Sequence, residues 1–94
     1  MPDTLYSQAP DLRTRPVEAA GSLIVFTPAR PKVHWLNLAG WYLFELSEGA
    51  SGEVIAADYA EAVAGQIPHD EALAQARDCL ADLVERGILI AEPA

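Results

Sequence analysis

The chain has 94 residues, of which 51% are hydrophobic, and a net charge of −8; this length allows one domain with a modest core. Residues 38–94 hold eleven acidic and only two basic side chains, whereas a surface that binds nucleic acid needs clustered Lys and Arg. The single cysteine, Cys79, excludes an intramolecular disulfide and a cysteine-based zinc site.

The first 37 residues are expected to form a flexible arm followed by a small sheet. Residues 1–12 are polar, contain two prolines and show no periodic pattern, so we expect a flexible N-terminal arm. Gly21 and the turn Pro28–Pro31 then separate three short segments, of which the last two are rich in β-branched and aromatic residues. The predicted strands are Pro16–Ala20, Ser22–Thr27 and Lys32–Leu36.

Residues 38–90 are expected to be helical, apart from glycine-containing turns and a last apolar segment. Apolar side chains recur at helical spacing in three segments, and each segment is followed by a glycine that suits a helix C-terminus. Ser51 is expected to cap the second helix, and Ile88–Ile90 is expected to run as a short apolar tail over the core. The predicted helices are Leu38–Glu48, Gly52–Ala64 and His69–Arg86.

This order of elements, with strands first and helices after them, predicts an α+β fold. We expect a small three-stranded antiparallel sheet followed by three helices, in a winged helix-turn-helix-like arrangement. The N-terminus has no basic segment followed by an apolar run, and no apolar stretch approaches the roughly 20 residues that cross a bilayer. We therefore expect a cytoplasmic protein without a membrane partner.

Motifs spread over Thr14–Ile90 resemble the PqqD family. A strand ends in Leu-Asn before a helix with a small residue and aliphatics, a short glycine turn follows, and the third helix closes in Leu-x-x-x-Gly followed by aliphatics. The matching positions are Leu36-Asn37, Ala39, Leu43, Leu46, Gly49, Leu83 and Gly87-Ile88-Leu89. The chain departs from the family pattern at Trp35, Ala76 and Cys79. These departures bear on the details of a bound peptide and not on the fold.

The PqqD family comprises recognition domains for ribosomally made, post-translationally modified peptides. The resemblance implies such a domain over residues 13–91, with residues 92–94 as a tail. It implies that the chain binds the leader segment of a precursor peptide as an extra strand on the third strand, beside the third helix. Such domains present the precursor to a radical SAM enzyme, a cyclodehydratase or a leader protease. The resemblance implies no catalysis and no cofactor.

The residues of the third strand favour the same surface. A terminal strand leaves backbone N–H and C=O groups free to pair with a peptide strand, whose alternate side chains then fill pockets. In an extended chain, Val33 and Trp35 share one face, and His34 and Leu36 share the other. We expect His34 to be either a strand residue with an internally satisfied ring or a groove residue, and Trp35 to be either a core or an interface aromatic.

The third helix is expected to provide the other wall of the groove. Its apolar stripe is centred on Leu80, with Arg77 on one flank and Cys79, as a buried inert thiol, on the other. We predict that the Arg77 flank lines the groove, where the guanidinium could pair with an acidic leader residue. Asp82 is expected on the polar face, away from the site. The predicted peptide-binding residues are Lys32, Val33, His34, Trp35, Leu36, Leu73, Arg77, Leu80 and Val84.

No catalytic or metal site is expected. The two histidines, His34 and His69, do not sit at metal-ligand spacing. The sequence has no phosphate-binding glycine loop, no nucleophile elbow and no paired catalytic carboxylates. Trp41 and Tyr42 are expected in the core.

Two alternative functions remain beside peptide binding. The first is a winged-helix DNA-binding protein, which the same architecture allows. It is disfavoured because Gly52–Ala64, the candidate recognition helix, contains no Lys, Arg, Asn or Gln. The second is a generic adaptor subunit of an enzyme complex.

Overall fold

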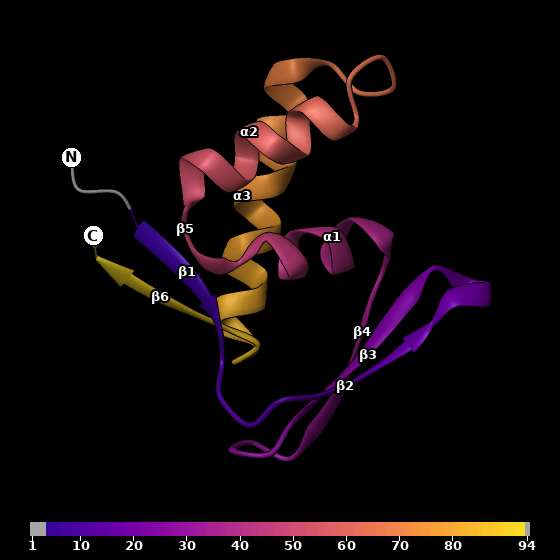
Figure 1. Cartoon of the computed structure of the whole chain (residues 1–94), viewed down its shortest axis with the longest axis vertical. Helices are drawn as coiled ribbons and strands as arrows, with labels where there is room; N and C mark the ends of the chain where they lie inside the picture. Colours follow the sequence, from indigo (N-terminus) through magenta and orange to yellow (C-terminus); the bar gives the residue numbers. More distant parts are fainter. Residues whose placement is uncertain (1–3, 94) are drawn as a thin grey trace.

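The computed structural model describes residues 4–93, and in this range the chain has the α+β class that the sequence predicts (Figure 1). The described part of the chain contains three α-helices and two three-stranded antiparallel sheets, with strand orders β2-β3-β4 and β5-β1-β6. Residues 1–3 of the expected arm and residue 94 of the expected tail lie outside the described residues. The elements are β1 (Thr4–Gln8), β2 (Arg13–Val17), β3 (Ser22–Thr27), β4 (Lys32–Leu36), α1 (Leu38–Leu46), β5 (Glu48–Ser51), α2 (Gly52–Ala62), α3 (His69–Glu85) and β6 (Leu89–Pro93).

The sheet β2-β3-β4 follows the chain as two successive antiparallel hairpins. Both β3 and β4 have the predicted bounds. Their side chains alternate as expected: Leu23 and Val25 of β3 are buried, whereas Val33 and Trp35 of β4 are 57% and 59% exposed on the outer face. This alternation leaves one face of the sheet for the core and the other for solvent.

The first strand of this sheet lies earlier than predicted. We expected it at Pro16–Ala20, whereas β2 ends at Val17 and Glu18–Ala20 form a short 3-10 turn. The N–H of Gly21 donates to the carbonyl oxygen of Glu18 at 3.0 Å. Gly21 has a φ of +62°, a conformation that glycine adopts without strain. This turn reverses the chain and takes residues 18–20 out of the strand.

The prediction of a flexible arm is wrong for the segment that forms β1. This strand is the centre of the second sheet, where it pairs antiparallel with β5 on one side and with β6 on the other. Its partners lie more than forty residues away along the chain: Leu5 pairs with Ser51, and Ser7 pairs with Ile90. The C-terminal residues up to Pro93, expected as an apolar tail and a short end, form β6.

Side-chain contacts also hold β1 against the helices. The ring of Tyr6 lies over Gly52 at the start of α2, where a Cβ would be 2.9 Å from the Cε2 atom of the ring. Glycine at this position therefore allows the close approach. The side-chain amide of Gln8 donates to the carbonyl oxygen of Phe44 in α1 at 3.1 Å.

All three predicted helices are present, with ends that differ by a few residues. Asn37 caps α1 by accepting a hydrogen bond from the N–H of Gly40 at 2.8 Å. Ser51 caps α2, as predicted, by accepting from the N–H of Val54 at 3.2 Å. The first helix ends at Leu46 and not at Glu48, because Glu48 begins β5 and pairs with β1.

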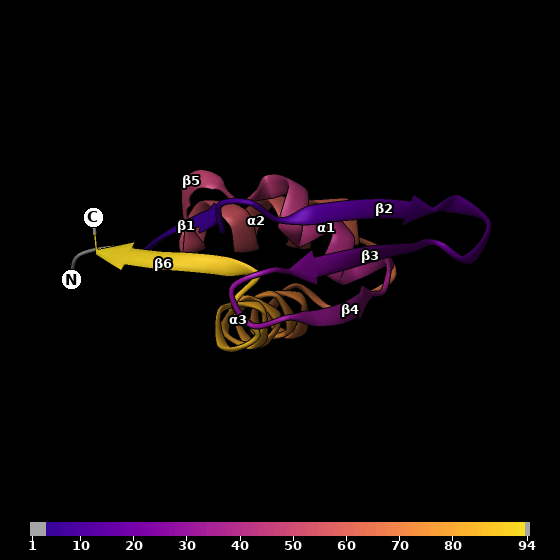
Figure 2. The same cartoon turned by 90° about the horizontal axis from the view of Figure 1, so that it is seen from below.

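The core lies between the helices and the inner face of β2-β3-β4, and β1 and β6 lie to the side of that sheet, at the left of Figures 1 and 2. Trp41 is half-buried, and its indole N–H donates to Oε1 of Glu45 at 3.3 Å. Tyr42 is 38% exposed, so it is not the core residue that we expected. The buried core residues are Leu23, Val25, Leu36, Leu43, Phe44, Ile55, Ala56, Tyr59, Ala60, Ala72, Ala76, Leu80, Leu83, Ile88 and Leu89.

Candidate functional site

The strand β4 is an open edge of its sheet, and α3 lies beside it (Figure 2). The opposite edge strand, β2, contains Pro16 and the exposed side chains of Arg13 and Arg15. Proline and charged side chains oppose the addition of a further strand. In contrast, β4 contains no proline and its register with β3 is continuous. The edge of β4 is therefore the one suited to pair with another backbone.

The register identifies which backbone groups of β4 face outward. Pro16 of β2 pairs with Leu23 of β3. Because a proline in an edge strand turns its nitrogen to solvent, we infer that this pair has no ladder hydrogen bonds. The backbone groups of Leu23 then point to Leu36 of β4. Bonded and non-bonded pairs alternate along an antiparallel ladder, so the N–H and C=O groups of Val33 and Trp35 point to the open edge.

A groove runs between the open edge of β4 and α3, and it consists of two hollows. The hairpin hollow has a volume of about 610 Å³ and the helix hollow a volume of about 200 Å³. Asp82 and Arg86 line both hollows and form an ion pair with an Oδ2–Nε distance of 3.0 Å. The hairpin hollow is lined by Thr27, Arg30, Pro31, Lys32, His34, Asp82, Glu85 and Arg86. The helix hollow is lined by Trp35, Leu36, Asn37, Gly40, Cys79, Asp82, Leu83 and Arg86.

Arg30 fixes the β3–β4 turn to the end of α3. Its guanidinium donates to the carbonyl oxygen of Glu85 at 2.9 Å. This carbonyl belongs to the last turn of the helix, where a cation is favourable. Gly87 makes room for the contact, since a Cβ at this position would lie 2.9 Å from Nη2 of Arg30. This contact therefore fixes the turn and the helix end, which are the two walls of the hairpin hollow, relative to each other.

His34 is a buried residue in the wall of the hairpin hollow. The hydroxyl of Thr27 donates to the carbonyl oxygen of Arg30 at 2.9 Å and lies 3.4 Å from Nε2 of His34. With its proton directed to Arg30, this hydroxyl is an acceptor for an Nε2–H of the neutral ring. Burial lowers the pKa of His34, and the nearby charges of Arg86, Lys32 and Arg30 lower the pKa further. The ring of His34 therefore has a hydrogen-bond partner within the protein and also lines the groove. It is both the strand residue and the groove residue that the sequence left as alternatives.

The helix hollow is less charged. Leu36 and Leu83 are buried in its wall, and Gly40 and Trp35 also line it. The half-buried thiol of Cys79 also lines it. Burial raises the pKa of this thiol, and the neighbouring carboxylate of Asp82 acts in the same direction. A protonated thiol is a poor nucleophile, so this hollow is suited to contact and not to covalent chemistry.

The predicted residues of β4 lie at the groove. Val33 points its side chain to the outer face and contributes its backbone to the open edge. The other four residues line the two hollows, and they are Lys32, His34, Trp35 and Leu36.

The predicted residues of α3 do not line the groove. Leu80 is 1% exposed in the core, and Leu73 and Val84 are half-buried against it. Arg77 is exposed and lies outside both hollows. The flank beside β4 is therefore the one with Cys79, and the prediction of the Arg77 flank is corrected.

Sequence reasoning missed Asp82 and Arg86 as groove residues. A helical stripe shows which residues face the core, but not on which side of the stripe the sheet edge passes. From the sequence alone, Arg86 is only the last residue of the predicted third helix, and Asp82 is expected on its polar face. Their spacing of four residues, which suits an ion pair on one helix face, was the available signal.

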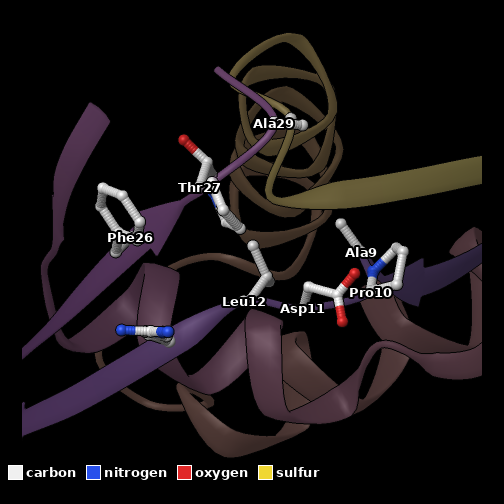
Figure 3. Close-up of a pocket in the computed structure, with 10 residues that line it drawn as sticks. Ala9, Pro10, Asp11, Leu12, Phe26, Thr27 and Ala29 are labelled. Atoms are coloured by element: carbon white, nitrogen blue, oxygen red, sulfur yellow. The ribbon is translucent and has the colours of Figure 1, made fainter. Parts of the chain in front are cut away.

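A larger hollow lies elsewhere, between the β1–β2 connection and the β3–β4 turn (Figure 3). It has a volume of about 720 Å³. Figure 3 shows Leu12, Phe26 and Thr27 around it, together with the carboxylate of Asp11. The hollow contains none of the residues of β4, so it is separate from the strand edge.

Comparison with protein-family models, with curated proteins and with solved structures gives no match for this chain. In residues 4–93, no group of three or more His, Cys, Asp and Glu side chains is placed to hold a metal ion. Within the same residues, no helix has the length and apolar character needed to cross a bilayer.

Proposed function

We propose that the chain is a non-catalytic binding module for the leader segment of a ribosomally made precursor peptide. The observation that carries the proposal is the open edge of β4 beside a groove on α3. The leader adds to β4 as a fourth strand, and its inward side chains enter the two hollows. The resemblance of the sequence to the PqqD family supports this assignment.

The strand edge supplies part of the free energy that binding requires. Val33 and Trp35 together offer two N–H and two C=O groups, and each backbone hydrogen bond contributes about 0.5–1.5 kcal/mol. Four such bonds supply about 2–6 kcal/mol, whereas micromolar affinity requires about 8 kcal/mol. Side chains in the hollows supply the remainder. Affinity therefore depends both on backbone pairing and on the sequence of the leader.

The module acts by presenting the precursor to a separate enzyme. A radical SAM enzyme, a cyclodehydratase or a leader protease is the partner that this function requires, and we place the protein with them in the cytoplasm. A generic adaptor subunit would use the same edge for another protein segment. A short precursor reading frame and a modifying enzyme beside this gene would favour the leader over that alternative.

DNA binding is not favoured by the surface of α2. The exposed side chains of this helix include Glu53, Asp58 and Glu61, and the helix contains no Lys or Arg. These carboxylates would repel the phosphate backbone. We expect no measurable binding to random duplex DNA at physiological salt. A micromolar, salt-sensitive complex in a fluorescence anisotropy titration would instead favour the winged-helix alternative.

Amide chemical shifts provide the direct test of the proposal. We expect a bound leader peptide to perturb the amides of Lys32–Leu36 and of Cys79–Arg86. Leu73–Arg77 of the same helix, together with α2, serve as internal controls because they lie away from the groove. Perturbations confined to Gly52–Ala62 would show that the ligand binds at the helix-turn-helix, and the proposal would then be wrong.

A further inference from the structure

The two ends of the groove differ in chemistry, and this difference selects a type of peptide. We infer, on the basis of the proposed function, that the bound strand has an apolar side chain in the helix hollow and an acidic side chain in the hairpin hollow. The acidic residue follows the apolar residue by four positions toward the C-terminus. The spacing comes from β4, since Leu36 lines the helix hollow and Lys32 lines the hairpin hollow.

The direction follows from the sheet to which the peptide is added. Both existing strand pairs are antiparallel, so an antiparallel peptide continues the ladder. Such a peptide passes Leu36 first and Lys32 last. Its side chains opposite Leu36, His34 and Lys32 point inward to the groove, and those opposite Val33 and Trp35 point outward. The inward positions are therefore the ones that the two hollows select.

The helix hollow selects an apolar side chain. Its lining combines Leu36, Leu83 and the neutral thiol of Cys79 with Asn37 and the ion pair of Asp82 and Arg86. The opposite charges of that pair leave the helix hollow without net charge, whereas the hairpin hollow carries additional cations. Its volume of about 200 Å³ is a third of that of the hairpin hollow, so it suits one aliphatic side chain. Burying that side chain would remove apolar surface of both partners from water.

The hairpin hollow selects an acidic side chain. It gathers Arg30, Lys32 and Arg86, half of the six basic residues of a chain whose net charge is −8. Against these three cations stand the carboxylates of Asp82 and Glu85, so the hollow has a net charge of +1. A peptide carboxylate would be attracted to this charge, and a peptide lysine would be repelled.

Two of these cations are available to the ligand. Arg30 is engaged by the carbonyl oxygen of Glu85. Lys32 has no ion-pair partner among residues 4–93. Arg86 pairs with Asp82, but their side chains are 40% and 50% exposed, and an exposed pair of this kind exchanges partners at little cost. Arg86 and Lys32 can therefore donate to the incoming carboxylate.

Selection from a library of random peptides displayed on phage tests this inference. We expect the wild-type chain to enrich peptides with an aliphatic residue followed, four positions later, by Asp or Glu. Replacing that acid by its amide should weaken binding about three- to tenfold. The variants Arg86→Gln and Lys32→Gln should each reduce this preference, whereas Asp82→Asn should increase it. Arg77→Gln is the matched control, because Arg77 lies on the same helix outside the groove.

The outcomes separate the inference from the proposed function. One outcome is that the selected peptides lose binding to Val33→Pro but have no acidic residue four positions after the aliphatic residue, or have the acidic residue first. In that case the inference about the two hollows is wrong, whereas strand addition stands. The same conclusion follows if Arg77→Gln reduces the preference as much as Arg86→Gln does. If no peptide is enriched, or if Val33→Pro binds the selected peptides unchanged, both the inference and the proposed function fail.

Discussion

Proline substitution along β4 distinguishes strand addition from other modes of binding. Val33 and Trp35 have outward N–H groups, whereas the N–H of His34 belongs to the ladder with β3, as the register through Pro16 indicates. Val33→Pro removes one outward donor and places a ring where the peptide backbone would approach. Because the side chain of Val33 is 57% exposed, the fold should tolerate the change.

The expected loss of affinity follows from the removed backbone bond. Losing one hydrogen bond and leaving the peptide carbonyl unpaired costs about 2–3 kcal/mol, which is roughly a 30- to 150-fold increase in the dissociation constant. Trp35→Pro should have a comparable or larger effect, since Trp35 also lines the helix hollow. Titration calorimetry with the leader peptide measures both, and circular dichroism checks that the variants are folded.

Two further variants serve as controls for this experiment. Val33→Ala keeps the N–H and should change affinity less than about threefold. His34→Pro removes a ladder donor and a buried ring, so it should destabilise the sheet itself. If folded Val33→Pro and Trp35→Pro both bind the leader at wild-type affinity, the ligand is not an added strand and the reasoning from the open edge is refuted.

Three other predictions concern stability and the groove. Deleting residues 1–8 should lower the free energy of unfolding by more than about 3 kcal/mol in urea titrations, because β1 is the central strand of its sheet; an unchanged value would mean that the segment is dispensable. Burial lowers the pKa of His34 below its usual 6.5, so the stability that depends on the neutral ring is fully present above this value and is lost as the pH falls through the lowered pKa. His34→Gln should therefore flatten the decline of unfolding free energy between about pH 7 and about pH 5, and an identical decline in both proteins would contradict the assignment. Bound leader should slow the alkylation of Cys79, the only thiol of the chain and part of the helix hollow; alkylation at the same rate with and without a saturating leader would place the peptide elsewhere.

The sequence determined the elements whose signals are local. The alternation of Val33 and Trp35 with His34 and Leu36 predicted which side chains of β4 share a face, because a strand repeats every two residues. The cap at Ser51 was also predictable, since its hydroxyl bonds to an N–H three residues away. The α+β class followed from the order of these elements along the chain.

The tertiary structure decided what depends on pairing across the chain. The residues of β1 have no periodic pattern of their own, and they form a strand because β5 and β6 supply backbone partners from distant positions. The orientation of α3 was set in the same way. Its apolar stripe predicted burial of Leu80, but only packing against the sheet placed Asp82 and Arg86, and not Arg77, beside β4. A stripe fixes the face that a helix buries, whereas the neighbour on each flank is fixed by how the sheet and helix dock.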